Sequence, residues 1–159
     1  MIRFAHLVKL LVLAAMCVYA GGLQAQKGFV DTSYYNTMGV DFKCTGGLLL
    51  PDNKVIIIGR FAFVHDRLIN CIARLNSDGT NDYTFNPGTG ANEHINVVVR
   101  QPDGKLIIAG DFTIYNGVTV NHICRIMPDG ALDPTFSVGT GFTVSGTVYS
   151  LYLQADGSI

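Results

Sequence analysis

The chain has 159 residues, of which 48% are hydrophobic and 14% are charged, and its formal net charge is −1. This balance excludes a basic surface of the kind that binds nucleic acid, because neutralising phosphates requires clustered Lys and Arg. It also excludes a largely disordered chain, since disordered segments are poor in apolar residues. We therefore expect a folded protein with a buried core and no nucleic-acid partner.

Residues 1–25 have the layout of a secretory signal peptide. Two basic residues precede an apolar stretch over 10–19, and small and polar residues follow as far as Ala25. This order predicts export with cleavage after Ala25, and therefore a secreted or cell-surface protein. No later segment reaches the roughly eighteen apolar residues of a membrane helix, so we predict no transmembrane span after the signal peptide. A lipid anchor at Cys17 is a second interpretation, which the bulky Met16 before it disfavours.

A repeat with an offset of 51 residues follows the signal peptide. Residues 51–90 align with 102–141 without gaps, and 18 of the 40 aligned pairs are identical. Duplication at one fixed spacing is typical of solenoids, propellers and other repeat architectures. We divide the mature chain, 26–159, into a partial unit over 28–43, full repeats over about 44–94 and 95–147, and a truncated repeat over 148–159.

Each full repeat is predicted to contain four antiparallel strands. In the second repeat they span 95–101, 105–113, 122–127 and 131–136. The last is a weak edge strand, because Pro134 cannot donate a ladder hydrogen bond. Asp-Gly pairs between strands predict hairpins with type I′ turns, in which both central residues have positive φ. The run 106–109 does not alternate with polar residues, so we expect neighbours on both faces of its strand.

Stacked four-stranded units predict an all-β fold of tandem antiparallel blades, which is an incomplete β-propeller. The chain holds about two and a half units, whereas propellers typically have about four to eight blades. We therefore expect an N-terminal fragment whose partners are further blades of the same full-length chain. The alternative is that another copy covers the open face.

Several motifs of the second repeat resemble the delta-60 repeat family. They are 101–105 (QPDGK), 110–112 (GDF), 115–117 (YNG), Ile123 with Arg125, and 129–136 (DGALDPTF), and the opening stretch 28–34 (GFVDTSY) is also similar. The resemblance implies a β-propeller of exported bacterial proteins and implies no catalytic activity, cofactor or ligand. The first repeat departs from these motifs at Asn53, Arg60 and 65–66, so the resemblance predicts its fold but not its turns.

Three aspartates recur once per unit, at Asp31, Asp82 and Asp133, each followed two residues later by Ser or Thr. We interpret them as hydrogen-bond acceptors for backbone at turns or strand ends, in preference to ligands or acids. The segment 76–82 superficially resembles a calcium loop. Its counterpart 127–133 lacks the alternating oxygen ligands, so we disfavour calcium there.

The equivalent arginines Arg74 and Arg125 lie within apolar strands, where a guanidinium requires a partner. We predict that each pairs with a turn carboxylate of its own blade, such as Asp78 or Asp129.

Specific function is expected among polar residues that do not recur, because a site need exist only once. These residues are Arg60, His65, Asp66, Arg67, Glu93, His94 and Asn96. A Glu93–His94 pair has the residue types for acid–base chemistry, but an exposed loop between blades is the favoured interpretation. We assign no catalytic, cofactor-binding or metal-ligating residue.

Cys44, Cys71 and Cys124 remain after cleavage, an odd number at non-equivalent positions. We favour small buried hydrophobic side chains, and a Cys71–Cys124 disulfide stays open as an alternative.

The predicted function is that of an exported, non-enzymatic β-propeller module that acts as a scaffold or as a cell-surface interaction or adhesion module with a protein or glycan ligand. The alternative is the repeat portion of a surface glycan-binding or glycan-processing protein whose active site lies beyond residue 159.

Overall fold

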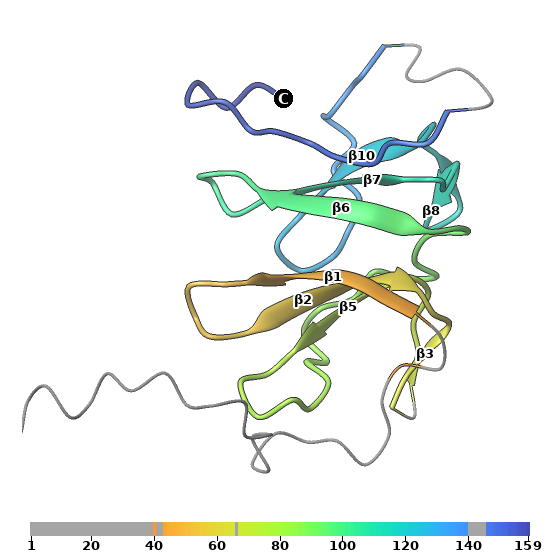
Figure 1. The fold of residues 1–159 in the computed structure, drawn as a ribbon, viewed down its shortest axis with the longest axis vertical. Helices are drawn as coiled ribbons and strands as arrows, with labels where there is room; N and C mark the ends of the chain where they lie inside the picture. Colours follow the sequence, from red (N-terminus) through yellow and green to blue (C-terminus); the bar gives the residue numbers. More distant parts are fainter. Residues whose placement is uncertain (1–39, 41–42, 66, 140–145) are drawn as a thin grey trace, which may run out of the picture. The chain divides into compact units, whose positions relative to one another are not determined.

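The structure, a computed structural model, describes residues 40, 43–65, 67–139 and 146–159 (Figure 1). The predicted signal peptide and nearly all of the partial unit 28–43 lie outside the described residues. Every regular element in the described part is a β-strand, which confirms the all-β fold. None of the described residues forms a helix long and apolar enough to cross a bilayer.

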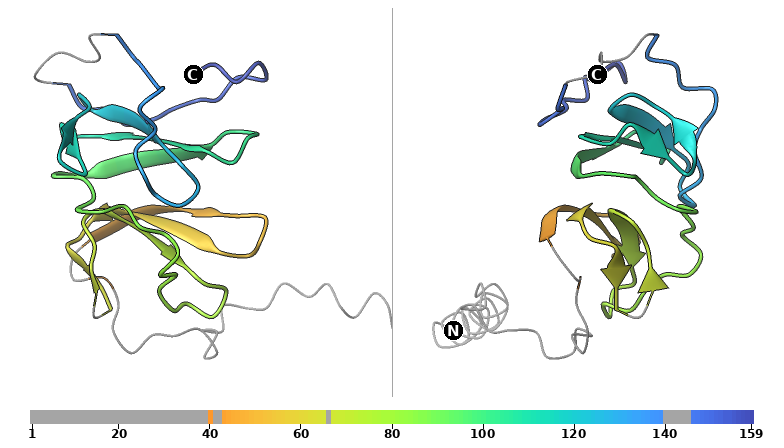
Figure 2. Two further views of the ribbon diagram at one scale, coloured as in Figure 1. Left: turned by 180° about the vertical axis from the view of Figure 1, so that it is seen from behind. Right: turned by 90° about the vertical axis from the view of Figure 1, so that its right-hand side faces the viewer.

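Two three-stranded antiparallel sheets form the frame. Blade 1 has the strand order β1-β2-β5, with bounds Lys43–Leu49, Val55–Arg60 and Ile72–Leu75. Blade 2 has the order β6-β7-β10, with bounds Ile95–Arg100, Leu106–Gly110 and Ile123–Ile126. Both views of Figure 2 show the two sheets side by side. Equivalent segments of the duplicated sequence therefore form equivalent strands, as predicted from the repeat.

The predicted fourth strand over 131–136 is not a strand. Its only ladder contact among the described residues is a single bridge at Leu132, which pairs with β10. Pro134 has no N–H, and the Asp133 carboxylate accepts the N–H of Thr135 at 2.9 Å, which turns the backbone away from the sheet. Each blade therefore consists of three strands and a bridged outer segment.

The hairpin turn between β6 and β7 is a three-residue loop. Gly104 N donates to Gln101 O at 2.9 Å, and Gln101 N donates to Lys105 O at 2.8 Å. Gly104 has a φ of 89°, whereas Asp103 is not among the residues with positive φ. This is a type I turn followed by a left-handed residue, so the type I′ prediction for this turn is wrong. The reason is that Pro102 occupies the first loop position, where its fixed φ suits a type I turn.

The same geometry recurs at four further turns of the described chain, 50–54, 76–80, 127–131 and 154–158. In the first blade Asn53 replaces glycine, with a φ of 63°, and its N–H still donates to Leu50 O at 3.0 Å. The departure from the repeat motif therefore leaves the turn unchanged, because Asn tolerates the left-handed region.

A type I′ geometry occurs instead in the connection between the second and third strands of blade 2. There β8 (Ile114–Tyr115) pairs with β9 (Val118–Thr119) across a two-residue loop. Its residues Asn116 and Gly117 have φ values of 46° and 79°. Blade 1 has the corresponding hairpin in β3 (Phe63–Val64) and β4 (Arg67–Leu68).

The main hydrophobic core joins the facing sides of the two blades. Its side chains are buried and include Ile56, Ile58 and Ile72 from blade 1 and Ile95, Leu106 and Ile108 from blade 2. A second cluster covers the other side of β7, where Ile107 and Ala109 pack with Val148 and Leu151. All five residues of β7 are buried, which confirms the prediction of neighbours on both faces.

Candidate functional site

The recurring aspartate of blade 1 lies at the centre of an ionic cluster. One Asp82 carboxylate oxygen accepts hydrogen bonds from Lys54 Nζ and Arg74 Nε, both at 2.7 Å. The other accepts from the backbone N–H of Thr84 at 2.9 Å and from its hydroxyl at 2.7 Å. Burial acts to raise the pKa of Asp82, but the hydrogen bonds from Lys54, Thr84 and Arg74 outweigh it and hold the pKa far below its ordinary value.

Blade 2 repeats this cluster around Asp133. The Thr135 hydroxyl and N–H donate at 2.6 and 2.9 Å, Lys105 Nζ lies 3.2 Å away, and Arg125 Nε donates at 2.8 Å. The Thr135 hydrogen bonds, with those from Lys105 and Arg125, hold the pKa of Asp133 far below its ordinary value. The recurring aspartates thus have the structural role predicted for them. Asp31, the third member, lies outside the described residues.

Each of the two arginines pairs with a carboxylate of its own blade, as predicted, but the partners are not the named examples Asp78 and Asp129. Arg74 pairs with Asp82 and not with Asp78, whose Oδ1 accepts the N–H and hydroxyl of Thr80 at 3.0 and 2.7 Å within its own turn. The outer segment brings Asp82 back beside β5, because Asp82 N donates to Arg74 O at 2.9 Å. In blade 2, Arg125 likewise pairs with Asp133 and not with Asp129, whose Oδ1 accepts the N–H of Ala131. Asp133 N donates to Arg125 O.

Each of these guanidinium groups also lies over an aromatic ring. Arg74 is 5.1 Å from the centroid of Phe85, and Arg125 is 5.0 Å from that of Phe136. These distances are typical of cation–π contacts, which anchor the outer segment of each blade to its third strand.

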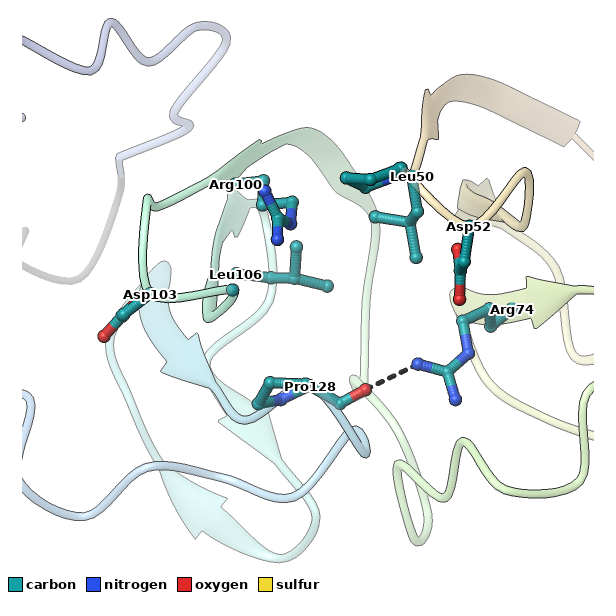
Figure 3. A pocket seen from close by; sticks show the side chains of 9 residues that line it. Leu50, Asp52, Arg74, Arg100, Asp103, Leu106 and Pro128 are labelled. Carbon is teal, nitrogen blue, oxygen red and sulfur yellow. Dashed lines mark hydrogen bonds between the residues drawn. The ribbon is translucent and has the colours of Figure 1, made fainter.

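A cavity of about 380 Å³ lies between the blades on the side of the Asp-containing turns (Figure 3). We call it the inter-blade pocket. Its lining residues are Leu50, Pro51, Asp52, Arg74, Arg100, Asp103, Gly104, Leu106 and Pro128. Arg74 Nη1 donates to the carbonyl of Pro128 at 2.7 Å, which ties blade 1 to blade 2 along one wall of the pocket.

Arg100 is the cationic lining residue whose side chain has no partner within the described part of the chain. No hydrogen bond or ion pair within the described part of the chain involves its side chain, whereas Arg74 donates from Nε, Nη1 and Nη2. Figure 3 shows the Arg100 side chain directed into the space beside Leu50 and Leu106. The aligned residue of the first repeat is Leu49, so this arginine does not recur. Sequence reasoning missed it, although a charged residue where the other copy has leucine is a detectable signal.

The acid–base pair considered from the sequence is not assembled. Glu93 lines a second cavity of about 460 Å³, together with Arg60. His94 Nδ1 instead lies 3.4 Å from Asp111 Oδ2, and Asn96 donates to the other oxygen of that carboxylate at 3.2 Å. His94 Nε2 is buried without a hydrogen-bond partner among the described residues.

The remaining non-recurring residues lie in or beside the blade 1 hairpin. The Arg67 guanidinium lies 5.3 Å from the centroid of the Tyr83 ring, and His65 has a φ of 55° at the hairpin loop. Asp66 lies outside the described residues.

None of the three described cysteines forms a disulfide, so the Cys71–Cys124 bridge left open by the sequence is not formed. Cys71 and Cys124 are buried, as predicted, whereas Cys44 is exposed. Burial raises the pKa of the Cys124 thiol well above its ordinary value, which makes it unreactive. The described residues contain no group of three or more His, Cys, Asp or Glu side chains placed to hold a metal ion.

Two segments of the chain, residues 50–85 and 101–136, match the family model described as domain of unknown function (DUF5122) beta-propeller. They are equivalent in the duplication, and each extends from the first turn of a blade to the aromatic residue beneath its arginine. No curated protein and no solved structure matches the chain. The two matches support a β-propeller repeat family and describe a domain of unknown function.

Proposed function

We propose that this β-propeller repeat domain is an exported, non-enzymatic module that acts as a scaffold or as a cell-surface interaction surface. Its repeats are of the delta-60 type, on the motifs at 101–105 and 129–136. The export part of the proposal is supported by the signal-peptide layout of residues 1–25.

One observation supports the interaction part of the proposal: the charged residues that recur in both blades are paired, whereas a charged residue that does not recur is unpaired. The recurring Asp82 and Asp133 are saturated by contacts inside their own blades. Arg100, which does not recur, lies at a cavity with its guanidinium unpaired among the described residues. A rigid frame that presents variable side chains at its surface is the arrangement used by interaction modules on repeat folds.

Export is tested by producing the full chain in a secretion-competent bacterium and measuring the mass of the product. We expect a mature protein that begins at Gln26 and lies outside the cytoplasm. The matched variant Ala25→Arg removes the small residue before the cleavage site and is expected to block processing. An unprocessed wild-type chain in the cytoplasm contradicts the export proposal.

The interaction role is tested by applying the purified chain to arrays of immobilised surface glycans and extracellular proteins. We expect saturable binding to a restricted set, with the captured ligand recovered at unchanged mass. A shortened glycan identifies a processing enzyme and contradicts the non-enzymatic role. The absence of saturable binding across both arrays contradicts the interaction role.

A further inference from the structure

We propose that the inter-blade pocket binds a small carboxylic acid, with the carboxylate on the Arg100 guanidinium and the apolar part of the ligand on Leu50 and Leu106. This inference deepens the proposed interaction function and rests on it, because it names the ligand chemistry of one site. The site is formed by both blades, and the sequence comparisons assign no ligand to it.

The first argument is the state of the guanidinium. Arg100 ends β6 and is exposed, and its guanidinium makes no hydrogen bond or ion pair to any described residue. An arginine side chain presents a planar set of N–H donors that matches a carboxylate or a phosphate in a two-point contact. The opposite wall already has its own guanidinium, Arg74, fully engaged by Asp82, Thr84 and Pro128. Arg100 is therefore the donor in this pocket that remains for a ligand.

The second argument selects carboxylate over phosphate. Asp52 and Asp103 line the same cavity, and Figure 3 shows Asp52 on the side opposite Arg100. The Asp103 side chain is directed away from this space in Figure 3 and pairs with Lys105 at 3.5 Å, which leaves the Asp52 carboxylate across from the unpaired guanidinium. A carboxylate in that position repels a dianion more strongly than a monoanion. A singly charged carboxylate is thus the anion that this charge distribution accepts.

The third argument concerns size and polarity. A volume of about 380 Å³ is at the lower end of the roughly 300–1,000 Å³ range of small-molecule sites. Leu50, Pro51 and Leu106 line the pocket with apolar side chains beside the charged group. A compact acid with one apolar group fits this combination, whereas a polymer chain requires a longer groove.

The fourth argument is that the pocket is formed before any ligand arrives. Arg74 bonds to Pro128 O at 2.7 Å, and Asn86 N donates to Asp129 O at 2.6 Å, so two hydrogen bonds hold the blades together on this side. A ligand then has little ordering cost to overcome on binding.

The test is a titration of the purified chain with phenylacetate at low salt, in which binding is measured by calorimetry or by NMR. We expect one site with a dissociation constant on the order of 1 mM, as befits about ten non-hydrogen atoms. The neutral alcohol 2-phenylethanol and inorganic phosphate are the comparison probes, and both are expected to bind at least tenfold more weakly. Equal or tighter binding of either probe overturns the proposal.

The decisive variant is Arg100→Leu, which introduces the residue that the first repeat has at Leu49 and is therefore compatible with the strand. We expect at least a tenfold loss of phenylacetate affinity, and a smaller loss for Arg100→Lys, which keeps the charge but not the planar fork. Lys43→Leu removes an exposed cation outside the pocket and is the charge-matched control, expected to change affinity less than twofold. Equal weakening by Lys43→Leu and Arg100→Leu overturns the specific pairing.

A third variant, Asp52→Asn, keeps the acceptor for the Lys54 N–H of its turn and removes one negative charge from the pocket. We expect phosphate binding to increase several-fold relative to phenylacetate, and an unchanged ratio contradicts the charge argument. Thermal unfolding of each variant verifies that it is folded.

Two further probes test whether the carboxylate belongs to a small molecule or to a polymer. A penta-glutamate peptide and polygalacturonate carry the same group on a polymer, and binding of either one more tightly than phenylacetate overturns the small-ligand assignment. The failures of the two proposals are distinguishable. Phenylacetate binding without any array ligand contradicts only the surface-interaction role, whereas an array ligand without saturable phenylacetate binding contradicts only this inference.

Discussion

The two blades share an ionic cluster and a cation–π contact but differ in several other side chains. The aspartate–arginine distance is 2.7 Å in blade 1 and 2.8 Å in blade 2, and both arginines stack on an aromatic ring. Where blade 2 has Arg100 and Asp111, however, the aligned residues of blade 1 are Leu49 and Arg60. The side chains of the ionic cluster are therefore repeated, whereas Arg100 at the pocket and Asp111 are not.

The largest expected effect tests whether the blades share one backbone geometry. A Cβ added at Gly59 overlaps the carbonyl oxygen of Lys43 on the neighbouring strand, and at Gly110 it overlaps that of His94. Gly59→Ala and Gly110→Ala are each expected to reduce the free energy of unfolding by about 3 kcal/mol or more, because backbone atoms must move. Chemical denaturation followed by circular dichroism measures the loss.

Gly46→Ala is the matched control, since its added Cβ lies 3.5 Å from the Ile58 side chain, an ordinary contact. We expect a change below about 1 kcal/mol. If Gly59→Ala is tolerated while Gly110→Ala is not, the equivalence of the two frames is contradicted.

The second prediction concerns the ionic cluster. Asp82→Asn keeps an acceptor for Thr84 but removes the charge that Lys54 and Arg74 share, so the partly buried Arg74 guanidinium loses its anion. We expect a loss of about 3 kcal/mol in the free energy of unfolding. Asp133→Asn is expected to change stability in the same direction. Asp52 is exposed and forms no ion pair within the described chain, so Asp52→Asn is the control and is expected to leave stability unchanged. A stabilised Asp133→Asn variant shows that the two clusters have different roles.

The duplication made the shared frame predictable. Strand positions, coverage of β7 and the role of the recurring aspartates follow from residues that are identical in both copies. Two errors arose from assuming that nearest neighbours in sequence are partners. Asp78 and Asp129 are the aspartates nearest to the arginines in sequence, but the β-bridge after each turn brings Asp82 and Asp133 closer in space. An Asp-Gly pair by itself predicts a two-residue loop, but the preceding Pro102 also belongs to the loop, which therefore has three residues.

The candidate site was less predictable for a physical reason. Arg100 is one charged residue at the end of an apolar strand, and nothing local distinguishes it from an ordinary surface residue. Its surroundings come from turns about fifty residues away, such as the one containing Asp52. Only the comparison with Leu49 in the other copy marks the position.

The third prediction follows from the lowered pKa values of Asp82 and Asp133. Because the folded-state pKa is below the ordinary value of 3.8, the carboxylates stabilise the fold fully above that pH and lose this contribution as the pH falls toward the folded-state pKa. For Asp82 we expect a loss on the order of 2 kcal/mol between about pH 5 and pH 2. Urea unfolding across this range measures it, and Asp82→Asn is expected to flatten the profile. A wild-type profile as flat as that of the variant contradicts the role of the cluster.

The fourth prediction concerns a bond that only blade 2 has. The Tyr115 hydroxyl is buried and donates to Gly130 O at 2.8 Å, whereas the aligned residue of blade 1 is Val64. Tyr115→Phe leaves that carbonyl unsatisfied and is expected to cost about 1–2 kcal/mol in thermal or urea unfolding. Tyr83→Phe, at a ring that is 67% exposed, is the control and is expected to be neutral. Equal effects of the two substitutions mean that the buried hydrogen bond is not stabilising blade 2.

The smallest expected effect comes from exchanging the one residue that differs between the equivalent three-residue loops 51–53 and 102–104. Asn53 and Gly104 both have positive φ, at 63° and 89°, and only the asparagine carries a Cβ in that conformation. Asn53→Gly is therefore expected to raise the free energy of unfolding by less than about 1 kcal/mol, and Gly104→Asn to lower it by a similar amount. A Cβ at Gly104 meets its nearest atom, Arg100 Nη2, at 3.6 Å, so packing adds little to the backbone effect. A reciprocal pair of shifts in the urea midpoint supports identical turns in the two blades. Shifts of the same sign, or a loss at Gly104 well above 1 kcal/mol, mean that the turn at the inter-blade pocket is under a constraint that its blade 1 counterpart lacks.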